Sequence, residues 1–286
     1  MKRKEILVLV LISLMLTLIA GCAGPSFEFG VIDVNSSPDG AKVYINGEDT
    51  GMVTPVIFHR IVGDYTIKLD LFHYKIWEGT VTINADQTTY IYESLPYADE
   101  GNITLQPGAK GKDATVTSFN ADTSLGGVPY LDSGKYITGG MIYYYRSYLQ
   151  FDLSNVPGNL RVVGACLKLR QIDSSGTANS NTIGLYQVTS DWGEYDITWN
   201  NQPTSSTVAE SSCTVYAGST GWRTWYNIGD LVKGWFDGSI ANQGMLLKAT
   251  DETSIDLIAQ YLSSDSTFEH GRECPKLRIT CYNPIP

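Results

Sequence analysis

Apolar and polar side chains alternate with a period of two along most of the chain. Residues 147–153 show this most clearly, because serine, leucine, phenylalanine and leucine share one face while tyrosine, glutamine and aspartate share the other. Successive side chains of a strand point to opposite faces, so the alternation predicts a half-buried β-strand. Further strands are predicted at residues 31–36, 42–45, 65–69, 80–83, 163–169, 183–188, 244–249 and 276–282.

Turn residues separate the first group of strands, which spans residues 30–95. Pro38-Asp39-Gly40 ends one predicted strand. Asn46-Gly47 joins the next two strands as a tight hairpin, because both residues tolerate positive φ. Residues 96–111 are rich in proline, glycine and acidic side chains, and we interpret them as a linker.

A second group of strands spans residues 105–282, and its start lies within the linker. One short helix is predicted there, with Asp230 as its N-cap and Gly238 at its end. Many short strands in a segment of this length are typical of a sandwich or jelly roll. The chain is therefore predicted to be all-β, with two β-sandwich domains, the second jelly-roll-like with one short helix.

The N-terminus carries a secretion signal. Basic residues at positions 2–4 precede an apolar run at 6–20, which closes on Ala20-Gly21-Cys22. A charged start, a short apolar run and small residues before a cut site are typical of a signal peptide, here residues 1–21. The ending resembles the lipobox of prokaryotic lipoproteins, which implies lipidation of Cys22 and a cell-membrane anchor on the extracytoplasmic face. The alternative is an uncleaved N-terminal anchor helix.

Composition narrows the classes of function. The formal net charge is −10, and an acidic chain repels phosphate backbones, so nucleic-acid binding is not expected. The chain has three histidines and no metalloprotease helix, phosphate loop or nucleophile elbow.

Four cysteines besides Cys22 permit up to two disulfides, whose pairing the sequence does not give. These four are Cys166, Cys213, Cys274 and Cys281.

The first group of strands carries a recognisable set of turns. The motif residues are Pro38-Asp39-Gly40-Ala41, Val43-Tyr44-Ile45-Asn46-Gly47, Gly51, Thr54-Pro55 and Gly63-Asp64-Tyr65. This segment resembles the PEGA domain family, with aspartate where the family name has glutamate. The resemblance implies a small β-sandwich of prokaryotic surface proteins with no catalytic role.

The second group carries its own set of motifs, at Asp113-Ala114, 145–154, 165–169, Asp191-Trp192-Gly193-Glu194, 198–203, 230–238 and 242–244. This segment resembles the disaggregatase-related domain DNRLRE, which implies a carbohydrate-binding-module-like β-sandwich. The Asn-x-Gly expected near Asp122 reads Thr123-Ser124-Leu125-Gly126 here, which argues against a calcium site of the family's kind in that segment.

One predicted strand face combines aromatic and polar side chains. Tyr144, Arg146, Tyr148 and Gln150 share a face by the period-two rule. Sugars stack on aromatic rings, and arginine and amide groups hydrogen-bond hydroxyls or carboxylates, so these four residues are our candidate carbohydrate-binding site. The alternative is an ordinary solvated sheet face, where Arg146 pairs with a carboxylate such as Asp152.

The remaining candidates are weaker. Trp192, Trp199, Trp225 and Trp235 are predicted to lie in the core, whereas Trp222 could be exposed. No loop shows an EF-hand spacing, so ordinary solvated acidic surfaces are the alternative to calcium sites. The carboxylates considered for calcium are Asp251, Glu252 and Asp256, or Asp113 with Asp122.

These observations predict a lipid-anchored, non-enzymatic protein whose C-terminal sandwich binds carbohydrate of the cell envelope or matrix. Its expected partners are membrane lipid through Cys22 and a polysaccharide. The alternative is a purely structural surface protein that contacts other envelope proteins. A polysaccharide-degrading enzyme is a third class, which would need two carboxylates about 5 to 10 Å apart across a cleft.

Overall fold

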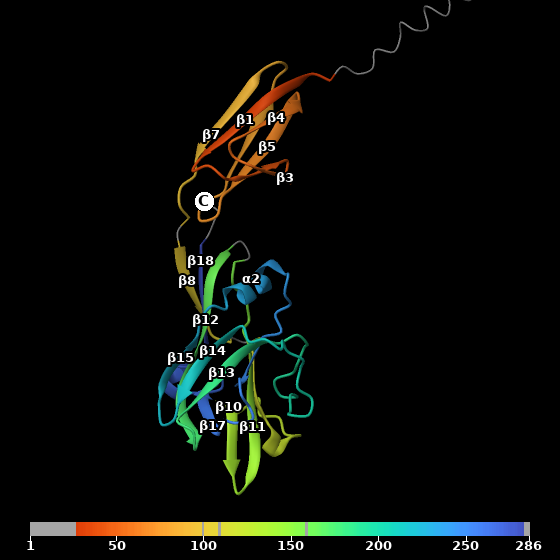
Figure 1. Cartoon of the computed structure of the whole chain (residues 1–286). Coiled ribbons are helices and arrows are strands. Elements are labelled where there is room, and N and C mark those ends of the chain that lie inside the picture. Colours follow the sequence, from red (N-terminus) through yellow and green to blue (C-terminus); the bar gives the residue numbers. More distant parts are fainter. Residues whose placement is uncertain (1–26, 99, 108–109, 158–159, 283–286) are drawn as a thin grey trace, which may run out of the picture. The chain divides into compact units, whose positions relative to one another are not determined.

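The protein was analysed as a computed structural model, which describes residues 27–98, 100–107, 110–157 and 160–282. The described residues divide into two compact units, one that ends at Tyr97 and one that begins at Ala98 (Figure 1). The predicted signal peptide, residues 1–21, and Cys22 lie outside the described residues. Among the described helices, none has the length and apolar character needed to cross a bilayer.

The first unit is a sandwich of two sheets. One sheet has the strand order β4-β1-β7 and the other β3-β2-β5-β6. Its strands are β1 (Phe29–Ser37), β2 (Lys42–Ile45), β3 (Glu48–Val53), β4 (Val56–Ile61), β5 (Gly63–Asp70), β6 (Trp77–Ile83) and β7 (Thr88–Ser94).

The predicted alternation places the core of this unit. Ile32 and Val34 of β1 are fully buried, and their side chains pack between the sheets. Asn46 and Gly47 join β2 to β3 with φ values of 51° and 84°, as the hairpin prediction requires. The Asn46 side chain also accepts a hydrogen bond from the backbone N–H of Thr66, which fastens the turn to β5.

The second unit is built from one continuous sheet that folds around a single large core. The strand order is β14-β13-β16-β11-β10-β17-β12-β18-β8, with β15 paired to β12 and β9 paired to β11. Its strands are β8 (Glu100–Leu105), β9 (Lys112–Thr117), β10 (Tyr130–Thr138), β11 (Met141–Gln150), β12 (Arg161–Gly176), β13 (Ser180–Gln187), β14 (Ser211–Tyr216), β15 (Gly221–Trp225), β16 (Met245–Ala249), β17 (Leu257–Leu262) and β18 (Lys276–Tyr282).

The all-β prediction is confirmed, and the described residues contain one α-helix, α2 (Gly229–Asp237), and two 3₁₀ turns, η1 (Ser118–Asn120) and η2 (Phe268–Gly271). Gly238 ends α2 in the left-handed conformation, at φ 76°, as predicted. Asp230 is not the N-cap: Ile228 occupies that position without a side-chain bond, and Asp230 lies in the first turn. Its charge there still favours the positive end of the helix dipole.

The predicted linker contains a strand of the second unit. β8 pairs antiparallel with β18, and Leu105 lies opposite Leu277. Residues 100–105 of the predicted linker therefore belong to the second unit, whose start was expected within this segment. Ile103 and Leu105 pack against the core of the second unit, and apolar burial outweighs the local turn chemistry.

The second unit also has a smaller apolar cluster on the outer side of β11. The irregular segment between β13 and β14, residues 188–210, supplies Trp192 and Ile197 to this cluster. Tyr148 of β11 packs against them with 1% of its surface exposed. Around Tyr148, both faces of β11 are therefore covered by protein, whereas the sequence pattern predicts that one face is solvated.

Candidate functional site

The predicted aromatic and polar face of β11 is largely enclosed. Tyr148 was expected to reach solvent, and this is wrong because Trp192 covers it, with the two ring centroids 5.8 Å apart. The Tyr148 hydroxyl donates to Gln202 Oε1 at 3.0 Å. Gln150 Nε2 donates to the backbone oxygen of Asn242 at 2.7 Å. These two side chains stabilise the fold around β11.

All three guanidinium nitrogens of Arg146 donate hydrogen bonds. Its Nε and Nη2 donate to the two carboxylate oxygens of Glu252 at 2.8 and 2.7 Å, and its Nη1 donates to Gln202 Oε1 at 3.1 Å. The guanidinium also lies 4.7 Å from the centre of the Trp199 ring, on which Tyr144 stacks at 6.1 Å. Arg146 therefore pairs with a carboxylate, as the solvated-face interpretation held, but the partner is Glu252 and not Asp152.

The five tryptophans of the second unit differ in how deeply they are buried. Trp192, Trp225 and Trp235 are at most 8% exposed, as predicted, and Trp199 is half-buried against the smaller cluster. Trp222 is also half-buried, but it lies three residues before Trp225 on the same strand and points to the opposite, outer face.

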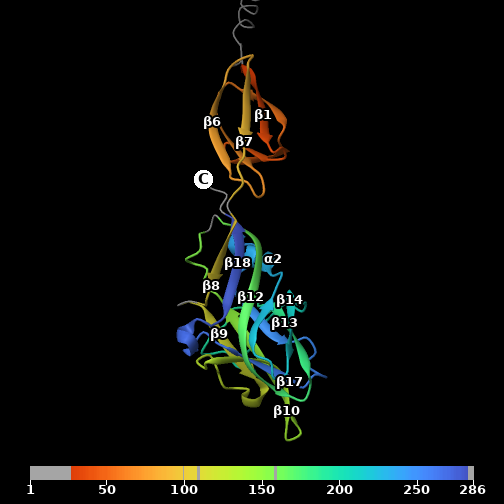
Figure 2. The same ribbon diagram turned by 90° about the vertical axis from the view of Figure 1, so that its left-hand side faces the viewer.

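Trp222 lies in a basic surface formed by the outer faces of β15, β12 and β18, which are neighbours in the sheet; Figure 2 shows β12 and β18 side by side. Lys168 and Arg170 alternate with buried leucines on β12 and so point outward. Lys276 and Arg278 do the same on β18. We call Trp222 and these four cations the basic face.

The two lysines converge on the tryptophan ring. Lys276 Nζ lies 4.6 Å and Lys168 Nζ 5.4 Å from the centre of the Trp222 ring. Lys168 and Lys276 are also direct cross-strand partners. Like charges opposite each other destabilise a sheet, so this pair is an energetic cost that an anionic ligand would relieve. Of the four cations, Arg170 pairs with Glu273 at 3.0 Å.

A groove of about 480 Å³ continues the basic face along β12 and β18. Its lining includes Arg278, Cys166, Thr280 and the exposed Tyr226, together with Asp230. Arg278 Nε donates to Asn102 Oδ1 of β8 at 3.3 Å. Cations, aromatic rings and amides thus lie along this surface, with the carboxylates of Asp230 and Glu273 among them.

Sequence reasoning missed the basic face, although a signal for it exists. The string Lys-Leu-Arg occurs twice, at residues 168–170 and 276–278, within two predicted strands. Period-two alternation puts both cations of each string on the face opposite the leucine. What the sequence lacks is the pairing of β12 with β18, which brings the two strings side by side.

A second, smaller pocket of about 220 Å³ lies between β10, β11, β12 and β17. Asp132, Asp173, Tyr136 and Tyr145 are among its lining residues. Burial, with a smaller contribution from the nearby Asp173 carboxylate, raises the pKa of Asp132 to about 7. Gln260 Nε2 donates to Asp132 Oδ1 at 3.2 Å.

The carboxylates considered for calcium are mostly engaged elsewhere. Asp251 accepts bonds from residues 253 and 254 of its own turn, and Glu252 is paired to Arg146. Asp256 accepts from Thr177 and from the backbone of Ile137. Asp122 accepts from Asn200 at 2.7 Å rather than lying beside Asp113.

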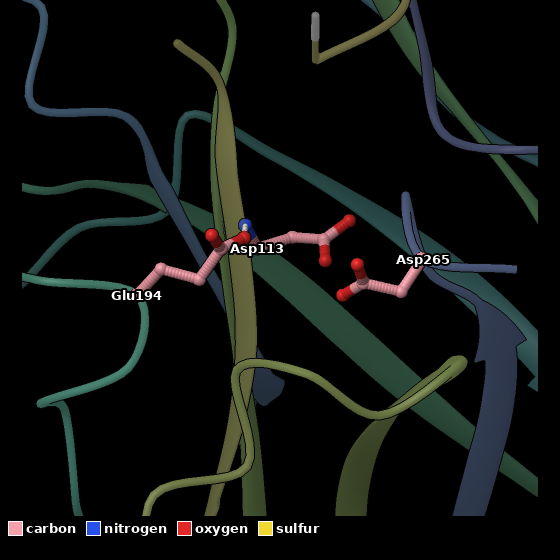
Figure 3. Close-up of side chains that lie close together, drawn as sticks. All are labelled: Asp113, Glu194 and Asp265. Carbon is pink, nitrogen blue, oxygen red and sulfur yellow. Dashed lines mark hydrogen bonds between the residues drawn. The ribbon is translucent and has the colours of Figure 1, made fainter. Parts of the chain in front are cut away.

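Asp113 instead lies beside Glu194 and Asp265, and Figure 3 shows the three side chains together. One oxygen from each of the three carboxylates lies within 4.8 Å of the other two.

The four cysteines of the second unit are all free thiols, and burial raises the pKa of Cys213 and Cys281.

Comparison with known proteins identifies both units. Residues 29–98 match the PEGA domain, and residues 105–279 match carbohydrate-binding module family 96. These matches confirm the predicted PEGA domain and the carbohydrate-binding-module-like second domain. Both are non-catalytic kinds of domain. No curated protein matches the chain.

Two solved structures show weak likeness. The crystal structure of BcpA*(D312A), the major pilin subunit of Bacillus cereus, is 7% identical with a TM-score of 0.21, covering 82% of this chain and 59% of that chain. The Bacillus anthracis TIE protein is 9% identical with a TM-score of 0.19, covering 70% and 44%. At such TM-scores neither likeness bears on function. The match to residues 105–279 covers more than half of the sequence, and the chain therefore belongs to carbohydrate-binding module family 96.

Proposed function

We propose that the protein is a lipid-anchored cell-surface protein that binds an acidic polysaccharide of the cell envelope or matrix through the basic face. Membership of a carbohydrate-binding module family supports the ligand class. The observation that carries the location is Trp222, whose ring lies close to the amines of both Lys168 and Lys276.

The physical argument joins two interactions at one surface. The C–H face of a sugar ring packs on an aromatic ring, and the half-buried Trp222 ring is on the outer face of the sheet. Ammonium and guanidinium groups form charge-assisted hydrogen bonds with carboxylates. The basic face offers both interactions, because the Trp222 ring lies within 5.4 Å of two lysine amines. The groove beside Arg278 extends this surface and gives room for a chain of several sugars.

The surface around Tyr144 and Arg146 remains the second candidate location for the glycan. Its donors already have partners: both carboxylate oxygens of Glu252 are bound to Arg146. A glycan would have to displace that ion pair, at an energetic cost that does not arise at Lys168 and Lys276, which form no ion pair among the described residues. We therefore place the binding function on the basic face.

The anchor rests on the sequence alone, since Cys22 lies outside the described residues. In this proposal, a diacylglyceryl thioether on Cys22 holds the chain to the membrane, because one acyl chain binds a bilayer only marginally. Mass spectrometry of the native N-terminus tests it. An unmodified Cys22, or a retained signal peptide, would contradict the anchor without touching the carbohydrate-binding proposal.

A glycan array with the full chain in detergent tests the binding function. We expect binding to glycans that carry carboxylates, weakening as salt rises because exposed ion pairs are screened. Lys168→Gln and Lys276→Gln should each weaken it. The matched control is Lys248→Gln, which removes a lysine 4.8 Å from the Tyr186 ring, away from the basic face. Glycan binding that every variant retains, without dependence on salt, would place the site outside the basic face. No binding to any glycan would favour a structural surface protein.

The pocket of Asp132 and Asp173 gives the enzyme alternative a place to be tested. It brings two carboxylic acids to one cavity, as polysaccharide hydrolysis requires. A reducing-sugar assay with the glycans that bind should show no turnover. Turnover that Asp132→Asn abolishes would replace the binding proposal with a catalytic one.

A further inference from the structure

Three carboxylates from distant parts of the second unit meet at one place (Figure 3). Asp113 belongs to β9, Glu194 to the segment between β13 and β14, and Asp265 to the connection between β17 and β18. Glu194 Oε1 accepts a hydrogen bond from the Asp113 backbone N–H at 2.9 Å, so its carboxylate is held beside β9.

Asp113 gives a second, independent sign of a ligand. Its side chain is only 1% exposed, and Figure 3 shows its carboxylate directed toward that of Asp265. Oδ2 accepts from the Ser264 backbone N–H at 2.7 Å, but Oδ1 is buried without any hydrogen-bond partner. A buried polar atom left unpaired costs the free energy of its lost hydration, and a charged one costs more.

The surroundings compensate this charge only in part. Ser264 offsets part of the cost through its hydrogen bond to Oδ2, whereas the neighbouring carboxylates of Asp265 and Glu194 add like-charge repulsion. Across the described part of the chain, no lysine or arginine forms an ion pair with any of the three acids. A bound cation would offset the charge of all three.

We propose that Asp113, Glu194 and Asp265 bind a calcium ion. Calcium takes oxygen ligands at 2.3 to 2.6 Å, so two ligands on opposite sides of one ion lie roughly 5 Å apart. The spread of the three oxygens, within 4.8 Å, fits that diameter. Magnesium holds its ligands at about 2.0 to 2.1 Å and keeps most of its water, so it suits a cluster of three protein carboxylates less well.

The site would add a further link between three segments that hydrogen bonds already connect. The segment of residues 188–210 carries Trp192, which covers Tyr148, and calcium at Glu194 would fasten it to β9. At Asp265 the ion would fasten the connection that leads into η2 and β18. Its role is therefore stabilisation of the second unit, on residues separate from those of the basic face.

Calcium titration of the full chain in detergent tests the site. Protein stripped with EDTA is titrated with CaCl₂ in a calorimeter, and its melting temperature is followed by circular dichroism. We expect one saturable site with Kd of roughly 0.1 to 1 mM, as in extracellular calcium modules. At ten times Kd, the melting temperature should rise by about 2 to 5 °C.

Substitutions test whether the measured calcium binding depends on these carboxylates. Asp265→Asn, at an exposed position, should weaken calcium binding at least about tenfold, since affinity follows the number of ligand charges. Glu194→Gln should do the same and serves as the second variant if one fails to fold. The matched control is Glu210→Gln, which removes an exposed carboxylate of the same unit.

Three results would overturn the proposal. The first is no saturable heat and no change in melting temperature up to 10 mM CaCl₂, roughly ten times the upper Kd expected. The second is unchanged calcium affinity in both Asp265→Asn and Glu194→Gln, and the third is an equal response to MgCl₂. Glycan binding is measured on the same samples, so a failed calcium site leaves the carbohydrate-binding proposal standing, and the reverse also holds.

Discussion

The Trp222→Ala change is the sharpest test of the basic face through a single side chain. Its half-buried ring lies 4.6 Å from Lys276 Nζ and 5.4 Å from Lys168 Nζ on the outer face of the sheet. Loss of one aromatic contact should cost binding about 1 to 1.5 kcal/mol, roughly a tenfold rise in Kd. Trp222→Phe keeps part of the ring and should fall between the two.

The same change should have a limited effect on stability. Two exposed cation–π contacts contribute about 0.5 to 1 kcal/mol each, so the free energy of unfolding should fall by about 1 to 2 kcal/mol. Trp225 on the same strand is fully buried, and its Nε1 donates to the Ile183 oxygen at 2.8 Å. Trp225→Ala should therefore cost about 3 to 5 kcal/mol.

The assay is isothermal titration calorimetry with the best-binding acidic glycan from the array, beside urea unfolding of each variant. Trp222→Ala should lower glycan affinity while keeping more stability than Trp225→Ala, because the Trp222 ring faces outward. Unchanged glycan affinity in Trp222→Ala would refute the placement of the site. A loss of stability as large as that of Trp225→Ala would refute the orientation of the ring.

Three further predictions follow from the enclosed residues. Tyr148→Ala should lower the free energy of unfolding by about 3 to 5 kcal/mol, and Tyr148→Phe by about 1 kcal/mol through the lost bond to Gln202, both measured in urea. Arg146→Ala should cost about 2 kcal/mol by leaving Glu252 unpaired, with glycan affinity retained; a loss of affinity without a loss of stability would favour the second candidate surface. Asp132 has a folded-state pKa of about 7 against 3.8 unfolded, so its folded form holds the proton between these values and stability falls as pH rises through that range. Asp132→Asn should therefore stabilise the protein at pH 8, by at most about 4 kcal/mol, and little at pH 4; an equal effect at both pH values would show that the Asp132 pKa is ordinary.

The alternation of side chains predicted most strands because a sandwich buries one face of each strand. Ile32 and Val34 are buried where the pattern places them, and Asn46-Gly47 turns as its chemistry requires. Local chemistry also predicted the end of α2 at Gly238. These features depend on residues that are neighbours in the sequence, so the sequence contains them directly.

The errors at the predicted carbohydrate-binding face have one physical origin, which is contact between residues far apart in the sequence. Tyr148 was expected to be solvated, but Trp192 and Gln202 cover it from a segment more than forty residues away. Arg146 finds its partner Glu252 at a separation of 106 residues. The side chains of Asp113, Glu194 and Asp265 meet only after the sheet has folded. Contacts of this range depend on strand order and loop paths, which periodicity does not encode.

Direct labelling of the binding surface tests the central proposal. An acidic oligosaccharide that binds is converted in part to reactive carboxylate esters, incubated with the full chain, and the acylated lysines are identified by mass spectrometry. Lys168 and Lys276 both lie close to Trp222, so they should be labelled first, and excess unmodified oligosaccharide should suppress their labelling. Suppressible labelling confined to lysines outside the basic face, such as Lys112 or Lys248, would contradict the account.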